Sequence, residues 1–437
     1  MRILVVGGGG REHAMVDKLA GDAPEAEILA APGNPGIARL ATCVPVAADD
    51  IAGLAALAED RSVDLTVVGP EVPLAAGIAD LFAARGLPLF GPGANAARIE
   101  SSKAFAKRLM RQHGVPTAEF ADFATPVKAH GYVDEKGAPI VIKASGLAAG
   151  KGAIVCETLE QAHAAVDELM VESRFGTAGE TVVIEEFMEG VEFSAFFLCD
   201  GERAVPLLPS RDYKRIGEGD VGLNTGGMGA YAPAGVPGDA PGTDRTADAV
   251  LERIHREIAL PVLEGLAAAD SAYRGFLYAG VMLTDAGPRV VEFNCRLGDP
   301  EAQVVLPMTA GDLVAPMLAV ARGESLAGWR AEPRTGSALT TVIASAGYPG
   351  SYDAGVELTI PDLDSSTARV YHAGTAMDGD RLVSAGGRVL AVTGLGVDLE
   401  EAGDRSRETA AAIAGDGLVW RHDIGWHERA AAPAAAR

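Results

Sequence analysis

The sequence predicts an α/β protein whose amino-terminal part is built on a parallel sheet. In the first hundred residues, short apolar runs alternate with helical patterns, and Gly-Pro pairs at 69–70 and 91–92 directly follow two of the apolar runs. This alternation is typical of a parallel sheet covered by helices on both faces. Ligands of such sheets lie beyond the carboxyl ends of the strands, which is where these Gly-Pro loops fall.

Regular elements are expected along the whole chain, in three regions. In the first region we expect strands at 3–6, 27–31, 64–68 and 88–90 and helices at 11–19, 49–59 and 73–84. In the second we expect helices at 101–113, 158–172 and 243–268, strands at 139–143, 181–186, 191–199, 275–284 and 289–294, and long loops at 145–152 and 209–233. In the third we expect strands at 337–345, 370–372 and 388–394 and a helix at 399–413.

Length and composition bound the class of protein. A chain of 437 residues suggests about three domains at ~150 residues each. Acidic residues outnumber basic ones by 60 to 37, a formal charge of −23, so no nucleic-acid partner is expected. Four dispersed cysteines indicate a reducing compartment, and neither a secretory leader nor an apolar run of ~18 residues is evident. We therefore expect a soluble, cytoplasmic protein without a membrane partner.

A glycine run at 7–10 follows the first predicted strand and opens a helix. A dinucleotide fingerprint would place its third glycine at position 12, where this chain has Glu12, and no acid closes the second strand. The pattern therefore argues against a dehydrogenase. We favour anion binding at the helix start, with Arg11 adding charge, over a purely structural turn.

A second small-residue loop, 145–152, lies between two predicted strands and has Lys143 before it and Lys151 within it. It departs from a Walker P-loop, because Ser145 stands at the first glycine position and Gly152 replaces the magnesium-binding Ser or Thr. Backbone amides and two lysines can still close over a triphosphate. Phosphate binding is favoured over a solvated hairpin.

Glu292 and Asn294 end a predicted strand, and Phe293 and Cys295 alternate with them. We expect the polar pair to share one face while Phe293 and Cys295 pack behind. A carboxylate and an amide oxygen suit Mg²⁺, which keeps water and substrate phosphates as its other ligands. Alone, such a pair is most simply explained as two solvent-exposed polar residues, but the sequence Arg-Leu-Gly-Asp-Pro-Glu that follows makes a metal site the more specific interpretation. The eight histidines show no metal-ligand spacing, so no zinc is expected.

Two further segments indicate ligand binding. The basic run 211–215 precedes an Asn-Thr-Gly-Gly-Met-Gly segment at 224–229, which suggests a pocket for an anionic substrate and a carboxylate rather than an ordinary mobile loop. Glu185 to Met188, with Glu192 four residues beyond, fits a nucleotide hinge that offers apolar groups to a base and a carboxylate to ribose, although taken alone it is only an amphipathic strand and a turn.

Taken together, these motifs resemble the glycinamide ribonucleotide synthetase family of the ATP-grasp superfamily. The matching stretches run in order across nearly the whole chain and include GGGGREHA (7–14), PIVIKASGLAAGKG (139–152), NTGGMGAY (224–231), VEFNCRLGDPEAQ (291–303) and HAGT (372–375). The resemblance implies a Rossmann-like pre-ATP-grasp domain at 1–100 and a central α+β ATP-grasp domain at 101–328 with a lid subdomain at about 117–190. It further implies a mixed α/β carboxyl-terminal domain at 329–426, and we expect a disordered tail at 427–437.

The resemblance also implies a reaction. ATP, glycine and 5-phosphoribosylamine would give glycinamide ribonucleotide, ADP and phosphate through a glycyl phosphate, in purine biosynthesis. Mg²⁺, or Mn²⁺, would assist, and small molecules would be the only partners of a monomer.

Site residues follow from the resemblance position by position. ATP would be bound by Lys103, Lys143, Gly150, Lys151, Gly152, Glu185, Phe187, Met188 and Glu192, and the metal ion by Glu292 and Asn294. Phosphoribosylamine would be bound by Gly9, Gly10, Arg11, Glu12, Asn34, Pro35, Gly36, Gly69, Pro70 and Glu71. Glycine and its phosphate would be bound by Asp212, Lys214, Asn224, Thr225, Gly226, Gly227, Met228 and Arg296. The catalytic residues would be Lys143, Lys151, Asp212 and Arg296.

Two positions depart from the family pattern, and two other functions stay open. Family members often carry Asp where this chain has Ser145 and Pro where it has Leu223. The alternatives are a carboxylase of the same superfamily that acts on an aminoimidazole ribonucleotide with bicarbonate, and a catalytically silent nucleotide-binding regulator. The Asn-Thr-Gly-Gly segment disfavours the first alternative. The second is disfavoured by the intact residues Lys143, Lys151, Glu292 and Asn294.

Overall fold

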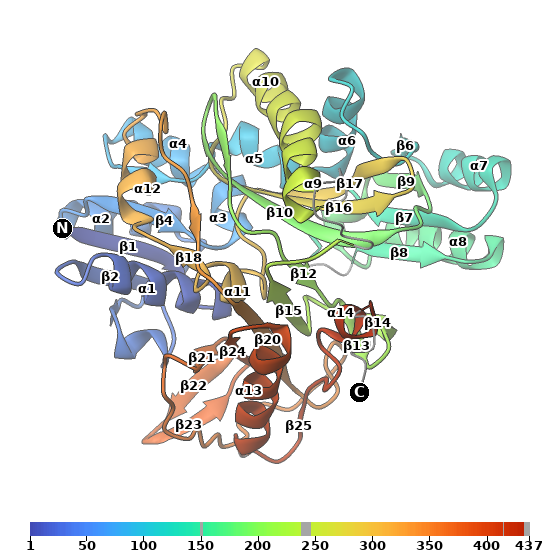
Figure 1. Ribbon diagram of the computed structural model, residues 1–437. Coiled ribbons are helices and arrows are strands. Elements are labelled where there is room, and N and C mark those ends of the chain that lie inside the picture. Colours follow the sequence, from blue (N-terminus) through green and yellow to red (C-terminus); the bar gives the residue numbers. More distant parts are fainter. Residues whose placement is uncertain (149–151, 237–245, 414, 432–437) are drawn as a thin grey trace.

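The amino-terminal part of the protein is a parallel sheet with helices on both faces, as its sequence predicts. The computed structural model describes residues 1–148, 152–236, 246–413 and 415–431 (Figure 1). The strand order is β3 (Thr42–Cys43), β2 (Glu27–Pro32), β1 (Arg2–Gly7), β4 (Leu65–Val68) and β5 (Leu89–Phe90), all parallel. The helices are α1 (Gly10–Asp22), η1 (Ile37–Arg39), α2 (Ile51–Asp60), α3 (Glu71–Ala75), α4 (Ile78–Ala84) and α5 (Ala94–Ser101).

One expected helix of this region is divided. The prediction of a single helix over 73–84 is wrong, because Gly77 adopts φ = 88° and separates α3 from α4. Such a left-handed backbone cannot continue a right-handed helix, and glycine adopts it without steric cost. The break turns the chain so that α4 packs beside α2 while α3 packs against α5.

The central region contains two antiparallel sheets, which lie in the right half of Figure 1. The first has the order β6 (Phe120–Phe123), β9 (Val182–Glu186), β7 (Ile140–Ala144), β8 (Ala153–Cys156). The second has the order β11 (Ala204–Pro206), β10 (Val191–Asp200), β16 (Arg274–Thr284), β17 (Gly287–Asn294). Helices α7 (Pro126–Lys136) and α8 (Leu159–Val166) pack on the first sheet and on each other, and α8 continues as a π-helical turn, Asp167–Val171.

The remaining elements of the central region surround these sheets. They are α6 (Lys103–Gln112), η3 (Gly176–Gly179), α9 (Ala247–Ile254), a π-helical turn (His255–Ala259), α10 (Leu260–Ala268), α11 (Ala302–Val305), α12 (Val314–Ala321) and the strand pair β18 (Thr309–Ala310) and β19 (Glu332–Pro333).

The carboxyl-terminal sheet takes in part of the segment that we expected to be a long structureless loop. Residues 209–233 instead contain β12 (Arg211–Asp212), β13 (Arg215–Gly217), β14 (Val221–Asn224) and β15 (Gly229–Ala232). Strand β15 pairs with β20 (Ser337–Ser345), giving the order β12, β15, β20, β24 (Arg388–Gly396), β21 (Ala368–His372), and β25 (Leu418–Val419) also pairs with β20. Within the segment β12 pairs with β15 and β13 pairs with β14, and only β15 also has a distant partner, β20. The loop prediction fails because backbone groups that leave water must be hydrogen-bonded, and this segment meets that need by forming strands.

Three other elements complete the carboxyl-terminal part. They are the β22 (Thr375–Asp378) and β23 (Arg381–Ser384) hairpin, α13 (Leu399–Ala412) and α14 (Trp426–Ala431). Helix α14 occupies the first part of the expected disordered tail, and residues 432–437 lie outside the described residues. No helix among the described residues is long and apolar enough to cross a membrane.

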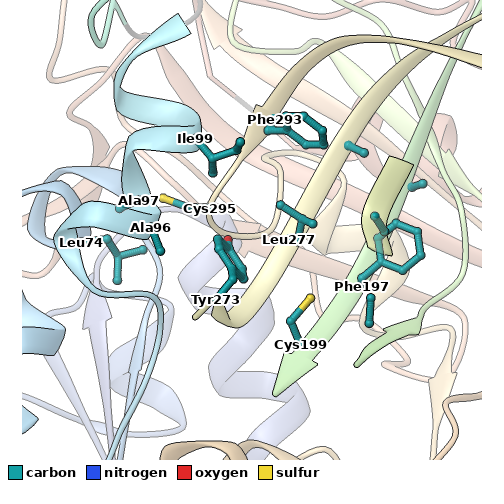
Figure 2. Packing of buried hydrophobic residues seen from close by; sticks show 14 of the residues in the cluster. Leu74, Ala96, Ala97, Ile99, Phe197, Cys199, Tyr273, Leu277, Phe293 and Cys295 are labelled. Atoms are coloured by element: carbon teal, nitrogen blue, oxygen red, sulfur yellow. The ribbon is translucent and has the colours of Figure 1, made fainter. Parts of the chain in front are cut away.

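A large apolar core lies behind β17 and fixes the direction of its polar side chains. Figure 2 shows Phe293 and Cys295 packed with Tyr273, Leu277 and Ile99, and Phe293 and Cys295 are each only 2% exposed. Because strand side chains alternate, Glu292 and Asn294 point away from this core. This confirms the predicted alternation.

Candidate active site

A cleft of about 630 Å³ lies where the three regions of the chain meet. It is lined by loops of the amino-terminal sheet, by strands of both central sheets, by the 211–226 segment and by Arg388 of β24. The cleft brings together side chains that are distant in sequence, such as Glu71, Lys143 and Glu292.

Most residues expected at the site line this cleft, but not all. Those that line it are Arg11, Glu71, Lys103, Lys143, Gly152, Glu185, Phe187, Met188, Glu192, Asp212, Lys214, Asn224, Thr225, Gly226, Glu292, Asn294 and Arg296. Those that lie outside its lining are Gly9, Gly10, Glu12, Asn34, Pro35, Gly36, Gly69, Pro70, Gly227 and Met228. Gly150 and Lys151 lie outside the described residues.

Two lysines converge on one buried carboxylate at the end of the cleft formed by the first central sheet. Lys143 Nζ lies 3.0 Å and Lys107 Nζ 2.9 Å from Glu185 Oε2. Burial alone would raise the pKa of Glu185, but the two lysines outweigh it and lower that pKa. Burial lowers the pKa of Lys107 to about 8, against the attraction of Glu185. Glu185 Oε1 is buried without a hydrogen-bond partner, so this acid keeps a free acceptor.

Lys103 begins helix α6, whose first turn is fixed by Ser145. Lys103 N donates to Ser145 O (2.8 Å), and Ala104 N donates to Ser145 Oγ (3.1 Å). Ser145 thus accepts from two N–H groups of the first turn, beside the N-cap residue Ser102, whose Oγ accepts from Phe105 N (3.3 Å). Burial lowers the pKa of Lys103, and the carboxylate of Glu292 opposes that shift.

The Glu292 and Asn294 pair has the donor chemistry of a magnesium site. Both side chains line the cleft and offer only oxygen to a cation. The Asn294 amide is oriented so that its nitrogen donates to Glu100 Oε1 (3.2 Å) and its oxygen accepts from Arg296 Nη1 (3.2 Å), which leaves that oxygen a second lone pair. Among the residues that the structure describes, no three His, Cys, Asp or Glu side chains form a metal cage. Such an open pair fits Mg²⁺, which relies on water and substrate phosphates for its other ligands.

Arg296 joins β17 to the amino-terminal region through two carboxylates. Its Nη2 lies 2.8 Å from Glu100 Oε1 and its Nε 3.3 Å from Glu71 Oε2. Burial raises the pKa of Glu100. Burial would also raise the pKa of Glu71, but Arg296 and Arg11 lower it overall. Two arginines and two acids therefore form one buried network on this side of the cleft.

Lys214 holds two acids together on the opposite wall. Its Nζ lies 2.8 Å from Asp212 Oδ1 and also pairs with Glu192 Oε2. Lys214 lowers the pKa of Glu192, whereas burial raises the pKa of Asp212. Glu301, 5% exposed, lines the same cleft, and burial together with the Asp212 charge raises its pKa to about 7.

The glycine-rich segment after β14 is shaped by the carboxyl-terminal region. Arg388 Nη1 donates to Gly226 O (2.6 Å), and Gly226 N donates to Tyr348 Oη (3.0 Å). Gly227 has φ = 112°, and a Cβ there would lie 2.4 Å from Pro300 Cδ, so only glycine fits. Met228 is fully buried beneath this turn.

The amino-terminal glycine loop is closed by Glu12 rather than left open to the cleft. Glu12 Oε2 accepts from Gly9 N (2.6 Å), and Glu12 Oε1 accepts from Arg11 Nε (2.7 Å). A Cβ at Gly69 would lie 2.1 Å from Glu12 Oε1, which explains that glycine. Asn34 is also fully engaged, because its nitrogen donates to Gly8 O (2.9 Å) and to His372 O (2.8 Å).

Comparisons with known proteins agree with this architecture. Models of phosphoribosylglycinamide synthetase match in three parts, the N domain at 1–100, the ATP-grasp (A) domain at 101–302 and the C domain at 338–427. The chain belongs to the phosphoribosylamine–glycine ligase family. Members from Rhizobium meliloti and Salmonella typhi are 44% and 45% identical, with 98% of each chain covered.

Solved structures give the same result. The crystal structure of phosphoribosylamine–glycine ligase from Thermotoga maritima matches with a TM-score of 0.82 at 33% identity and covers 97% of this chain and 100% of that one. The biotin carboxylase domain of Hydrogenobacter thermophilus 2-oxoglutarate carboxylase, at 18% identity, matches with a TM-score of 0.73 over 97% of this chain and 92% of that one, and this likeness shows the shared fold alone. Family membership confirms the predicted resemblance and sets aside the dehydrogenase and carboxylase alternatives.

Several cleft residues were missed by the sequence reasoning. Lys107, Glu100, Glu301 and Arg388 line the cleft although none of them had been assigned to the site. Lys107 stands four residues after Lys103 on α6, so a second lysine on one helix face was an available signal. Glu301 lay within the quoted Asp-Pro-Glu motif. Arg388 lies in the stretch GGRVLAVTGLG (386–396), which also matches the family, but no site role was assigned to it because that role depends on contact between distant regions.

Proposed function

We propose that this member of the phosphoribosylamine–glycine ligase family joins glycine to 5-phosphoribosylamine at the expense of ATP. The products are glycinamide ribonucleotide, ADP and phosphate. This reaction is a step of purine biosynthesis. The observation that carries the proposal is the convergence of Lys103, Lys143, Glu292 and Asn294 on one cleft in a chain that matches the family over almost its whole length. A monomer in the cytoplasm is the expected setting.

The reaction proceeds in two displacements. A carboxylate oxygen of glycine attacks the γ-phosphorus of ATP, the bond to the β-phosphate oxygen breaks, and ADP leaves. The amine nitrogen of phosphoribosylamine then attacks the carbonyl carbon of the glycyl phosphate, the carbon–oxygen bond breaks, and phosphate leaves. The nitrogen loses one proton. Positioning and charge neutralisation supply most of the acceleration in steps of this kind.

ATP lies along the two central sheets in this proposal. Lys103 and Lys143 face its phosphates, and Glu185 orients Lys143 through their 3.0 Å ion pair. Phe187 and Met188 offer apolar surface to the base, and Glu192 offers a carboxylate to ribose. Gly150 and Lys151, which lie outside the described residues, and Gly152 would also bind the phosphates.

A divalent ion is expected beside these phosphates. Glu292 and Asn294 would hold it, and Mg²⁺ suits their oxygen donors better than a softer metal. When bound, the ion neutralises charge on the phosphate oxygens.

The acceptor substrates occupy the rest of the cleft. Asp212, Arg296 and the backbone of the Asn224–Gly226 segment would position glycine and its phosphate. Arg11 and Glu71 line the cleft from the amino-terminal region and would contact phosphoribosylamine. The other amino-terminal loop residues would act through them, as Glu12 does through its 2.7 Å bond to Arg11.

We assign to Glu301 the role of accepting the proton that the phosphoribosylamine nitrogen loses in the second displacement. It is buried in the cleft, and its pKa of about 7 lets it ionise near neutral pH and still accept a proton.

The deciding experiment measures ADP release by the purified protein with MgATP while glycine and freshly generated phosphoribosylamine are omitted in turn. We expect turnover only with both, and glycinamide ribonucleotide as the product. Turnover that is indifferent to glycine would contradict the proposal. ATP binding without any turnover would identify a silent regulator instead. Replacing Mg²⁺ by Mn²⁺ in the same assay tests the choice of metal.

A further inference from the structure

A pair of histidines lies on the outer helices of the first central sheet and outside the cleft lining. His130 on α7 and His163 on α8 face each other with their Nδ1 atoms 2.7 Å apart. The rings are 4.9 Å apart between centroids and inclined by 32°. Helices α7 and α8 run side by side at the right of Figure 1 and contact each other.

Each histidine is held by an aspartate of the opposite helix segment. His130 Nε2 lies 3.1 Å from Asp167 Oδ1, and His163 Nε2 lies 3.0 Å from Asp134 Oδ1. The sequence H-x-x-x-D occurs at 130–134 and again at 163–167. In each copy the Asp bonds to the His of the other copy. The result is a crossed arrangement with the two Nδ1 atoms at its centre.

Hydrogen bonding of this arrangement requires a definite number of protons. Both Nε2 atoms face carboxylates and must carry hydrogen to donate. The 2.7 Å contact between the Nδ1 atoms needs one hydrogen between them and has no room for two. All four ring nitrogens are therefore hydrogen-bonded when a single hydrogen lies between the two Nδ1 atoms, whose lone pairs point toward each other.

We propose that this pair is a binding site for a divalent transition-metal ion of the Zn²⁺ class, which replaces the shared proton. Both ligands would be imidazole Nδ1 atoms, and water would complete the coordination. Two imidazoles on one Zn²⁺ at about 2.0–2.1 Å lie roughly 3.3 Å apart, so the rings need to separate by well under 1 Å. The side chains of His130 and His163 are 28% and 33% exposed, which leaves room for this movement and for water.

The aspartates strengthen this assignment. Histidines that bind metals usually donate their other ring N–H to a carboxylate, which fixes the tautomer and the ring orientation. Asp134 and Asp167 supply that partner to both rings. This ion would lie apart from the Glu292 and Asn294 pair, and imidazole nitrogen selects a different class of metal from their oxygens.

Titration calorimetry of the EDTA-treated full-length protein with Zn²⁺, in excess Mg²⁺, tests the proposal. We expect one Zn²⁺ per chain, with the stoichiometry read from the midpoint of the titration. Because the ion would link α7 to α8, Zn²⁺ should also raise the unfolding temperature. Co²⁺ in place of Zn²⁺ gives a visible spectrum that reports the ligands.

Variants separate this site from adventitious binding. His163→Asn and His130→Gln should each remove the calorimetric site, and Asp134→Asn should weaken it by about 10- to 100-fold while leaving both ligands in place. His113→Gln, a histidine of the same region outside the pair, is the matched control and should bind as the wild type does. Binding that survives in both ligand variants would overturn the proposal.

Discussion

Arg388 and Asp299 form an ion pair that joins the carboxyl-terminal sheet to the candidate active site. Arg388 Nη2 lies 3.2 Å from Asp299 Oδ2, and Arg388 Nη1 donates to Asp299 O (2.7 Å) and to Gly226 O (2.6 Å). Burial would raise the pKa of Asp299, but Arg388 and Arg11 outweigh it and keep the acid ionised. One side chain of β24 therefore fixes the relative position of the glycine-rich turn and the segment after β17.

We predict that Arg388→Met lowers kcat and raises the KM for glycine, because the Gly226 turn loses its anchor. A reduction in kcat/KM of roughly tenfold to a hundredfold is expected for a misplaced binding segment. Steady-state kinetics with each substrate varied gives the answer, and circular dichroism checks folding. Arg381→Met, at the exposed first residue of β23 in the same carboxyl-terminal region, is the control and should be neutral. Equal kinetics for both variants would show that the anchor is dispensable.

Glu292 gives the second prediction, which concerns the metal ion. Glu292→Ala should raise the Mg²⁺ concentration needed for half-maximal activity and lower kcat, because only one protein oxygen donor, that of Asn294, would then remain. Titrating Mg²⁺ at saturating ATP measures both effects. Asp285→Ala removes an exposed acid from the turn of the same β16–β17 hairpin and should change neither. An unchanged Mg²⁺ dependence in Glu292→Ala would remove Glu292 from the metal site.

The sequence was sufficient to predict the parts of the structure that depend on local pattern. Four of the five strands of the amino-terminal sheet (β1, β2, β4 and β5) and the alternation of Glu292 and Asn294 with Phe293 and Cys295 follow from periodicity, and the structure contains both, whereas the two-residue strand β3 was not predicted. Motif residues such as Lys143 and Glu185 also lie in one cleft, as a nucleotide site requires.

What the sequence did not predict depends on contacts between distant segments. Strand β15 was missed because its partner, β20, lies about a hundred residues further along the chain. One local contact was also missed: Glu12, the third residue of α1, accepts from Gly9 N in a capping-box arrangement, where the glycine run had been interpreted as an anion site. Arg388 can bind the Gly226 carbonyl only because the carboxyl-terminal sheet packs against the cleft.

The third prediction concerns Glu301 and pH. If Glu301 accepts the amine proton, kcat should fall as pH decreases through about 7, where its carboxylate becomes protonated. Glu301→Gln should lower kcat by on the order of 10²-fold and remove this dependence. The pH profile of kcat at saturating substrates measures both, and Glu324→Gln, an exposed acid, is the control. A Glu301→Gln profile that keeps the same limb would assign the titration to another group.

The raised pKa of Glu301 also predicts how the stability of the folded protein depends on pH. The pKa of Glu301 is higher in the folded protein than in the unfolded chain, so the folded state binds more protons between its ordinary pKa and about 7. Stability from this group is therefore present at low pH and is lost as pH rises through that window. Glu301→Gln should raise the unfolding temperature relative to wild type at pH 8 more than at pH 5. A pH-independent difference would contradict this.

The final prediction concerns two neutral histidines between the amino- and carboxyl-terminal regions. His13 Nδ1 accepts from His372 N (2.8 Å), a bond that a proton on Nδ1 would abolish. Burial lowers the pKa of His13 to about 3 and that of His372 to about 4, with each shift increased by a neighbouring positive charge.

Acid should therefore destabilise this contact. The unfolded chain binds more protons than the folded protein between about pH 6.5 and 3, so stability falls as pH decreases through that window, by on the order of 1–3 kcal/mol at pH 5. His13→Asn keeps an acceptor for His372 N but cannot titrate, so its urea midpoint should fall less between pH 7 and pH 5 than that of the wild type. His422→Asn alters an exposed histidine and should follow the wild type. The two histidines lie beside Asn34 and Gly36. If His13→Asn retains the wild-type pH dependence, the contact between His13 and His372 does not cause the acid sensitivity.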